Sequence, residues 1–463
     1  MTSDADNGRP PLPGMDDRAQ PRRVGPVSAG RLSLAALAGV SALALCPGPA
    51  AAMDDDSSGL TTLARRDAMD DWMKRKVYGV STVDERTRAE IANLGLKVGP
   101  YVVLPSVTAS TVYDDNLYDS PDGEVGDFRY EVAPTLMLKS DLPRGALDFM
   151  AGGRFVRFQD HEEENFADAF ASLTWSLDID HANAIGGEIG SRYTHEERYS
   201  PESPAEAREP VPSWVNEISL RFIHDAGRLA LSGGVDAADV DFYDVEAFDG
   251  SIIDQDFRDN RRFGGFLRFD YRFSPGYEAF VSARIDHRDY DGGDGPGHTE
   301  MSYVGRAGIN FELTPVLWMG LAGGYALTDS DASGSSTVGS TVGEASLKWL
   351  PSEVVTVTLT ASRSLAETTY VNAPAIREQG LDLTIDYEIM HNLTAKLSLG
   401  YEEADFLETT RMDEIIRGRI GLDYTLNDNA VFTLSYEHRE RDSSLDAYDA
   451  DDNRYMAGVT LRF

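Results

Sequence analysis

The feature that most constrains the fold of this chain is a strict alternation of apolar and polar residues that runs to its last position. One face of an extended strand over residues 455–463 would carry Tyr455, Ala457, Val459, Leu461 and Phe463. Side chains of a β-strand point alternately to its two faces, so a period of two indicates a strand with water on one side and an apolar medium on the other. The end of the chain is therefore predicted to be an amphipathic strand.

The same alternation is repeated along most of the chain. It is found in residues 101–113, 128–138, 147–155, 263–273 and 393–401. An open sheet of such strands would leave unpaired backbone groups at its first and last strands, and these edges invite aggregation. Pairing the last strand with the first removes both edges. We therefore expect the strand that begins at Tyr101 to pair with the final strand and close the sheet.

The predicted connections between strands alternate between short and long. Short turns are predicted at 140–141, 180–183, 224–227, 274–276, 314–315, 351–352, 390–392 and 427–429. Longer and mostly acidic loops are predicted between them at 196–213, 241–259, 291–300, 367–375 and 441–451. Short turns at one end and long loops at the other are typical of transmembrane barrels. The predicted fold is all-β, a transmembrane antiparallel up-and-down β-barrel of about 18 strands over residues 101–463, with short periplasmic turns and long extracellular loops.

Composition excludes several classes of function. The 463 residues carry a formal net charge of −36, which argues against binding to nucleic acid. The single cysteine, Cys46, leaves no disulfide to expect. The sequence contains neither a His-Glu-x-x-His zinc motif nor a Gly-x-Ser-x-Gly nucleophile elbow. We therefore predict no enzymatic activity, no metal site and no cofactor.

The N-terminal residues differ from the rest. Residues 1–31 are polar and include arginines, residues 32–46 are apolar, and small residues at 50–52 precede an acidic stretch. This is the order of a secretory signal peptide, which we predict over residues 1–52. Residues 53–100 are predicted to be a periplasmic lead segment. It would be either a flexible approach to the first strand or a handle or partial plug.

The terminal strand resembles the C-terminal β-signal of bacterial outer-membrane proteins. Phe463 is terminal, Leu461 and Val459 alternate back from it, and the aromatic Tyr455 stands nine positions from the end. The resemblance implies recognition by the barrel assembly machinery. It also implies residence in the outer membrane of a Gram-negative cell, in contact with outer-membrane lipid and lipopolysaccharide.

Several short motifs along the chain also resemble those of a known protein family. They are residues 83–86 (Val-Asp-Glu-Arg), 94–99, 104–107 (Leu-Pro-Ser-Val), 113–118 (Tyr-Asp-Asp-Asn-Leu-Tyr), 195–198 (His-Glu-Glu-Arg), 200–201 and 259–262 (Asp-Asn-Arg-Arg). In them the chain resembles the outer-membrane β-barrel porin family (type 2) associated with exopolysaccharide and capsule export. The resemblance covers most of residues 83–463. It implies a channel through which a polysaccharide chain leaves the periplasm, with periplasmic export proteins as partners.

Basic side chains are expected on the polar, lumen-facing side of the strands. The candidate residues are Arg262, Arg268, Arg272, Arg284, Arg288, Arg306, Arg417, Arg419 and Arg439. Acidic residues share this face, so one interpretation is that the charges pair across strands and keep the lumen polar. The other is that arginines around 262–306 stay unpaired and form a ladder for an anionic polymer, because a planar guanidinium suits carboxylate and phosphate groups.

Three functional hypotheses follow from these patterns. The first is an outer-membrane conduit for export of an exopolysaccharide. The alternative is a general or substrate-selective diffusion porin, which predicts a constriction loop folded into the lumen. The third is a structural or adhesive barrel whose acidic loops bridge lipopolysaccharide through divalent ions.

Overall fold

The structure of the protein is a computed structural model. It describes residues 82–83, 95–121, 123–140, 142–200, 203–204, 206–292, 297–331, 337–368, 370 and 373–463. These residues belong to one unit of the chain, Leu37–Phe463, and the other unit, Met1–Ala36, lies outside the described residues. The predicted signal peptide (1–52) and most of the predicted lead segment (53–100) also lie outside them.

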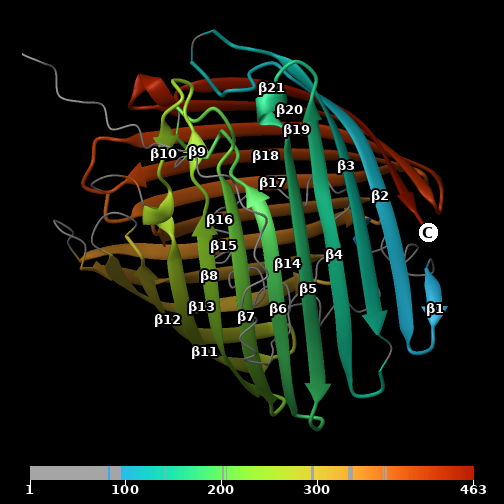
Figure 1. Ribbon diagram of the computed structural model, residues 1–463. Helices are drawn as coiled ribbons and strands as arrows, with labels where there is room; N and C mark the ends of the chain where they lie inside the picture. Colours follow the sequence, from blue (N-terminus) through green and yellow to red (C-terminus); the bar gives the residue numbers. More distant parts are fainter. Residues whose placement is uncertain are drawn as a thin grey trace, which may run out of the picture. The chain divides into compact units, whose positions relative to one another are not determined.

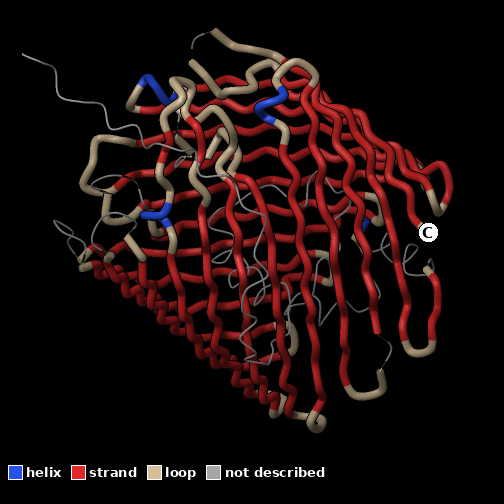
Figure 2. Tube along the Cα trace, in the orientation of Figure 1, coloured by secondary structure: helices blue, strands red, loops and turns tan. Residues whose placement is uncertain are grey.

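Strands make up most of the described chain, in which the helices are single turns (Figure 2). The long strands are β2 (Tyr101–Asp114), β3 (Asp127–Ser140), β4 (Gly145–Phe158), β5 (Phe166–Asp178), β6 (Asn183–His195), β7 (Pro212–Asp225), β8 (Leu229–Phe242), β11 (Asn260–Ser274), β12 (Tyr277–Tyr290), β13 (His298–Thr314), β14 (Leu317–Ser330), β15 (Val338–Ser352), β16 (Val355–Ala366), β17 (Ile376–Met390), β18 (Leu393–Phe406), β19 (Met412–Asn427), β20 (Ala430–Ser443) and β21 (Ala450–Arg462). The short elements are β1 (Leu96–Val98), β9 (Val245–Glu246), β10 (Ile252–Ile253) and the 3₁₀ helices η1 (Glu162–Glu164), η2 (Asp256–Arg258) and η3 (Asp446–Tyr448). No helix in the described ranges is long and apolar enough to cross a membrane.

The long strands form a closed barrel (Figure 1). Each pairs antiparallel with the next, β8 pairs directly with β11, and β2 pairs with β21. The closing register sets Ser106 opposite Arg462 and Asp114 opposite Arg454. The predicted 18-stranded antiparallel barrel, closed between its first and last strands, is confirmed. Closure gives each of the long strands a paired neighbour on both sides, as a hydrocarbon environment requires.

β1 pairs with the first residues of β2, which β21 leaves without a partner. β21 pairs with β2 only from Ser106 onward, whereas Leu96–Val98 pairs with the first residues of β2, Tyr101 to Val103. The tight turn between them contains Gly99, whose φ of 61° lies in the left-handed region that favours glycine. β1 therefore occupies one edge of β2 at its first residues, and β21 occupies the same edge from Ser106 onward.

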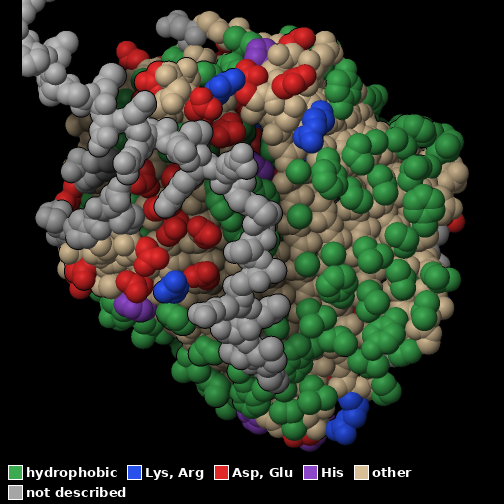
Figure 3. Space-filling model, in the orientation of Figure 1, with side chains coloured by type: hydrophobic (Ala, Val, Ile, Leu, Met, Phe, Trp, Pro, Cys, Tyr) green, Lys and Arg blue, Asp and Glu red, His purple; other side chains and the backbone are tan. Residues whose placement is uncertain are grey.

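The two faces of the sheet differ in polarity, as the alternation predicts. On β11 the outward Phe263 and Leu267 are both 57% exposed, whereas the inward Arg262 and Asp270 are buried. Figure 3 shows hydrophobic side chains spread over the side of the barrel and Asp and Glu side chains gathered toward the end that bears the long loops. Because a monomeric soluble protein rarely exposes an apolar surface of this extent, the outward face is one that contacts lipid.

Short and long connections alternate along the barrel. Two-residue turns join β11 to β12 and β13 to β14, whereas the loops at 196–211 and 243–259 are the long connections between β6 and β7 and between β8 and β11. The turn predicted at 351–352 lies two residues later, because Pro351 and Ser352 continue β15. The turns therefore define the periplasmic end and the loops the extracellular end.

Candidate functional site: the constricted extracellular mouth

The loop at 196–211, here called L3, folds against the inner wall of the barrel. Its Glu197 lies 3.5 Å from Nη1 of Arg454 on β21 and 3.9 Å from Nη2 of Arg154 on β4. Arg454 is opposite Asp114 in the closing register, on the inward face of both strands. The first turn of L3 therefore makes its ionic contacts on the lumen side of the sheet.

Tyr199 carries L3 further across the mouth. The ring of Tyr199 lies under two guanidinium groups of β20, with its centroid 4.1 Å from Cζ of Arg439 and 5.0 Å from Cζ of Arg441. Nη1 of Arg441 also donates a 2.8 Å hydrogen bond to the Tyr199 carbonyl oxygen. Such cation–π contacts are most favourable where they are shielded from water. Because β20 is six strands from β6 around the sheet (Figure 1), L3 narrows the opening.

The base of L3 is held by the next loop along the chain. Glu196 accepts hydrogen bonds of 2.9 Å from both Nη atoms of Arg258 in η2, and both side chains are buried. Behind this pair, Ala207 and Val211 of L3 pack against Val245 of β9. Removing one partner of a buried ion pair costs about 3–5 kcal/mol, so this contact fixes the base of the loop firmly.

The charge on Glu197 is set by the surrounding arginines. Burial acts to raise the pKa of Glu197, but the guanidinium groups of Arg454 and Arg154 outweigh burial and lower the pKa to about 2. Burial raises the pKa of Tyr199 to about 12. Glu197 is therefore ionised and Tyr199 neutral at physiological pH, the states in which both contacts with the wall are favourable.

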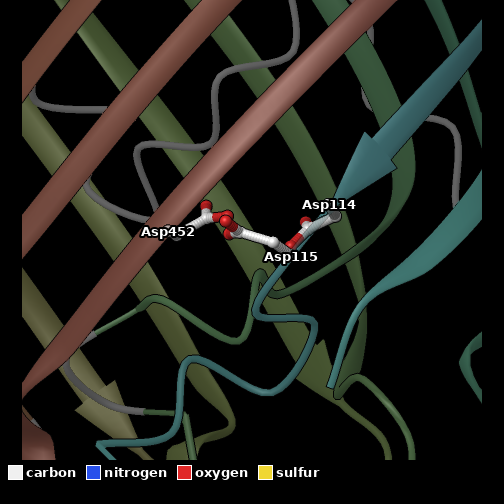
Figure 4. A group of neighbouring side chains, drawn as sticks. All are labelled: Asp114, Asp115 and Asp452. Atoms are coloured by element: carbon white, nitrogen blue, oxygen red, sulfur yellow. The ribbon is translucent and has the colours of Figure 1, made fainter. Parts of the chain in front are cut away.

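Three carboxylates meet at the seam between β2 and β21: those of Asp114, Asp115 and Asp452 (Figure 4). Their oxygens lie within 4.8 Å of one another, a spacing that a divalent cation would accept. Nε of Arg454, however, lies 2.9 Å from Asp114 Oδ2 and 2.7 Å from Asp452 Oδ2, and Nη2 of Arg439 is 2.9 Å from Asp452 Oδ2. The arginines already compensate the charges of Asp114 and Asp452, and Asp115 accepts hydrogen bonds from Asn453, so the cluster positions Arg454 for its contact with Glu197.

A second loop also reaches inward. Glu367, the first residue after β16, forms an ion pair with Arg288 of β12 and accepts a 3.2 Å hydrogen bond from Ser302 of β13. β12 lies four strands from β16 around the sheet. The loop at 367–375 is therefore tied to the inner wall on the other side of the mouth from L3.

The predicted lumen arginines lie on β11, β12, β13, β19 and β20, at positions that alternate with the outward apolar residues. Their ion pairs are Arg262–Asp236, Arg268–Glu278, Arg272–Asp225, Arg284–Asp236, Arg288–Glu367, Arg417–Glu402, Arg419–Glu437 and Arg439–Asp452. Arg306 also has an interaction partner. These contacts favour the interpretation in which charges pair across strands over that of an unpaired arginine ladder.

The inner face of β15–β18 is mainly acidic and hydroxylic, and is here called the acidic wall. Its charged residues are Glu344, Lys348, Glu378, Asp382, Asp386, Glu388, Lys396 and Glu402. On β16 the inward residues are instead Thr356, Thr358, Thr360, Ser362 and Ser364. Carboxylates outnumber ammonium groups on this wall by six to two, and Glu402 and Lys396 pair with Arg417 and Asp423 of β19.

The sequence marks Glu197 and Tyr199 only weakly. The His-Glu-Glu-Arg motif at 195–198 places Glu197 at a strand end, but its partners come from distant parts of the chain. Tyr199 and its hydrogen-bonding partner Arg441 are 242 positions apart. Only the closure of the barrel brings these segments together.

The residues of the predicted assembly signal lie at the outward face of the closing strand. Tyr455, Leu461 and Phe463 are 52%, 41% and 61% exposed, and Val459 shares their side of β21. Their recognition by the barrel assembly machinery stays a prediction.

With this geometry established, the chain can be placed among known proteins. The family model described as "Putative beta-barrel porin 2" matches residues 88–463. The chain belongs to this beta-barrel porin family. The porin fold, the apolar outer wall and the family together place the protein in the bacterial outer membrane as a channel, not an enzyme.

Solved structures of other outer-membrane proteins are similar to this porin at low sequence identity. Pseudomonas aeruginosa OpdK, solved with vanillate, has a TM-score of 0.42 and 11% identity over 78% of this chain and 99% of its own. Acinetobacter baumannii OccAB4 has a TM-score of 0.43 and 12% identity over 78% and 98%. The copper transporter OprC has a TM-score of 0.45 and 13% identity over 74% and 62%. No curated protein matches the sequence.

Proposed function

We propose that this porin is a constricted diffusion channel for small hydrophilic solutes, and that L3 sets the upper size limit of what passes. The observation that carries the proposal is the attachment of L3 to the inner wall through Glu197 and Tyr199. A barrel of 16 to 18 strands is otherwise wide enough for an open aqueous channel, so an inward loop is the element that limits passage.

The acidic wall suggests which solutes pass most easily. Cations and neutral polyhydroxylated molecules find carboxylate and hydroxyl acceptors along β16 and β17, whereas small anions meet a negative potential. The paired arginines of β11 and β12 leave little free positive charge to offset it. We therefore expect moderate selectivity for cations.

Export of an exopolysaccharide remains a prediction drawn from the family resemblance. An extended polymer would need L3 and the loop at 367–375 to leave the inner wall, and it would need periplasmic export proteins to deliver it. Bridging of lipopolysaccharide by the acidic loops is likewise a prediction. Neither has an observation in its favour comparable to the attachment of L3.

The proposal is tested by reconstituting the purified porin in liposomes and following swelling in neutral sugars of increasing size. We expect rapid entry of monosaccharides and a sharp decline for larger oligosaccharides. Reversal potentials in a potassium chloride gradient should show cation preference. Swelling that is equally fast for large oligosaccharides would refute the constricted channel, and loss of surface polysaccharide in a deletion strain would favour export instead.

A further inference from the structure

Part of the lumen wall is buried although it lines a channel. At the periplasmic end of β13–β16, this floor patch consists of Asn310, Trp318, Ser346, Leu350 and Thr356. Their side chains belong to the inward face, since Asn310 is opposite Gly320 and Gly320 is opposite Ser346. The five residues are 0%, 4%, 8%, 3% and 3% exposed, respectively.

Packing within the wall buries Trp318 and Leu350, which contact each other and Val316, but it does not satisfy the side chain of Asn310. The side-chain amide of Asn310 has no hydrogen-bond partner on either Oδ1 or Nδ2 among the described residues. A polar group on the wall of a wet lumen is normally solvated, so the unsatisfied amide of Asn310 marks a part of the wall that is covered.

Two residues of the N-terminal lead lie at this patch. The backbone N–H of Val83 donates a 3.1 Å hydrogen bond to Oγ1 of Thr356, across 273 positions of sequence. Thr82 and Val83 are only 6% and 3% exposed. The 13 positions from Val83 to Leu96 of β1 can span about 45 Å. This is enough to cross the floor of an 18-stranded barrel roughly 36 Å wide.

The charges of the lead segment and of the acidic wall are also complementary. In a chain of net charge −36, residues 73–88 carry five basic residues against two acidic ones. The wall beside Thr356 is acidic, with Asp386 directly opposite Thr356 on β17. Opposite charges on a segment and on the surface beside its contact favour docking, and they do so less at high salt.

We propose that Thr82 and Val83 dock on the floor patch and narrow the periplasmic entrance there as a second constriction. The bound partner is thus this chain's own N-terminal segment, recognised by an apolar and hydroxylic patch beside the acidic wall. This inference is independent of L3, which lies at the other end of the lumen.

Cysteine cross-linking in the full-length protein tests this docking. With Cys46 changed to serine, the pair V83C/T356C should form a disulfide under mild oxidation about tenfold faster than V83C/S176C, because docking gives a high effective concentration of one thiol near the other. Ser176 lies at the same end on β5, nine strands away. High salt applied before oxidation should slow the first reaction.

Folding of each variant is checked by its heat-modifiable migration in gels, and V83C/T358C serves as a second pair on the same strand. In planar bilayers the cross-linked porin should show a steady low current, and reduction should restore larger openings. Equal cross-linking to β5 and β16 in folded protein, or no cross-link in either β16 pair, would overturn the proposal.

Discussion

Replacing Glu197 with glutamine should weaken the attachment of L3 to the wall, leaving the contacts of Tyr199 with Arg439 and Arg441. The pKa of Glu197 is lowered from 4.5 to about 2 by Arg454 and Arg154. This lowering corresponds to roughly 3 kcal/mol of preference for the ionised form. Since the side chain is 28% exposed, part of this is screened by water and the value is an upper limit. The barrel itself should fold normally, because Arg454 keeps Asp114 and Asp452 as partners.

The assay is single-channel recording in planar bilayers. A loss approaching 3 kcal/mol would shift the balance between attached and released L3 by about a hundredfold, so Glu197→Gln should show frequent larger openings where the parent protein shows few. The control is Glu206→Gln, an exposed position of the same loop. Identical open levels and noise in the Glu197 variant and the parent would refute the idea that this contact holds L3.

The same contact predicts a pH dependence. The pKa of Glu197 is lowered in the folded protein, so its contribution is fully present above the unfolded value of about 4.5. It is lost as the pH falls through about 2. Acidification of the extracellular bath below pH 4 should therefore increase large openings of the parent protein and leave Glu197→Gln almost unchanged. If acidification increased large openings equally in both proteins, groups other than Glu197 would be responsible for the effect.

Three further predictions concern the loop base, the outer wall and the lumen. Arg258→Met leaves its carboxylate partner buried and unpaired, and should weaken the base of L3 by about 3–5 kcal/mol, measured as faster proteolysis within the loop. Val281→Arg on the outward face of β12 should destabilise the barrel by about 2–4 kcal/mol in urea titrations in vesicles, whereas Ser282→Glu on the inward face, opposite Arg268 and Arg306, should cost much less. Asp382→Asn combined with Asp386→Asn should reduce the cation preference of the reversal potential, and an unchanged potential would show that the acidic wall does not set selectivity.

Much of the fold can be predicted from local sequence, because each barrel strand shows an alternation of apolar and polar residues. The alternation in residues 263–273 and 455–463 specifies which face meets lipid, and turn residues such as Pro275-Gly276 specify where strands end. The turn predicted at 351–352 is displaced to Glu353 and Val354, because proline is also acceptable at the end of a strand.

The site is less predictable because its contacts join distant segments. An arginine on an inward position shows where its side chain points, but its partner depends on side-chain geometry across strands. Arg262, for example, pairs with Asp236 on the neighbouring strand, whereas Arg288 pairs with Glu367 from a loop four strands away. Tyr199 and Arg441 meet only after the barrel closes. The alternation of apolar and polar residues along the strands does not predict such contacts.

The most direct test of the central claim is a distance between spin labels at S200C in L3 and E440C on β20, measured in the full-length porin in native outer-membrane vesicles. L3 lying against the inner wall of β20 predicts a single short and narrow distance distribution. A broad distribution centred at long distances would place L3 outside the lumen and contradict the constricted channel.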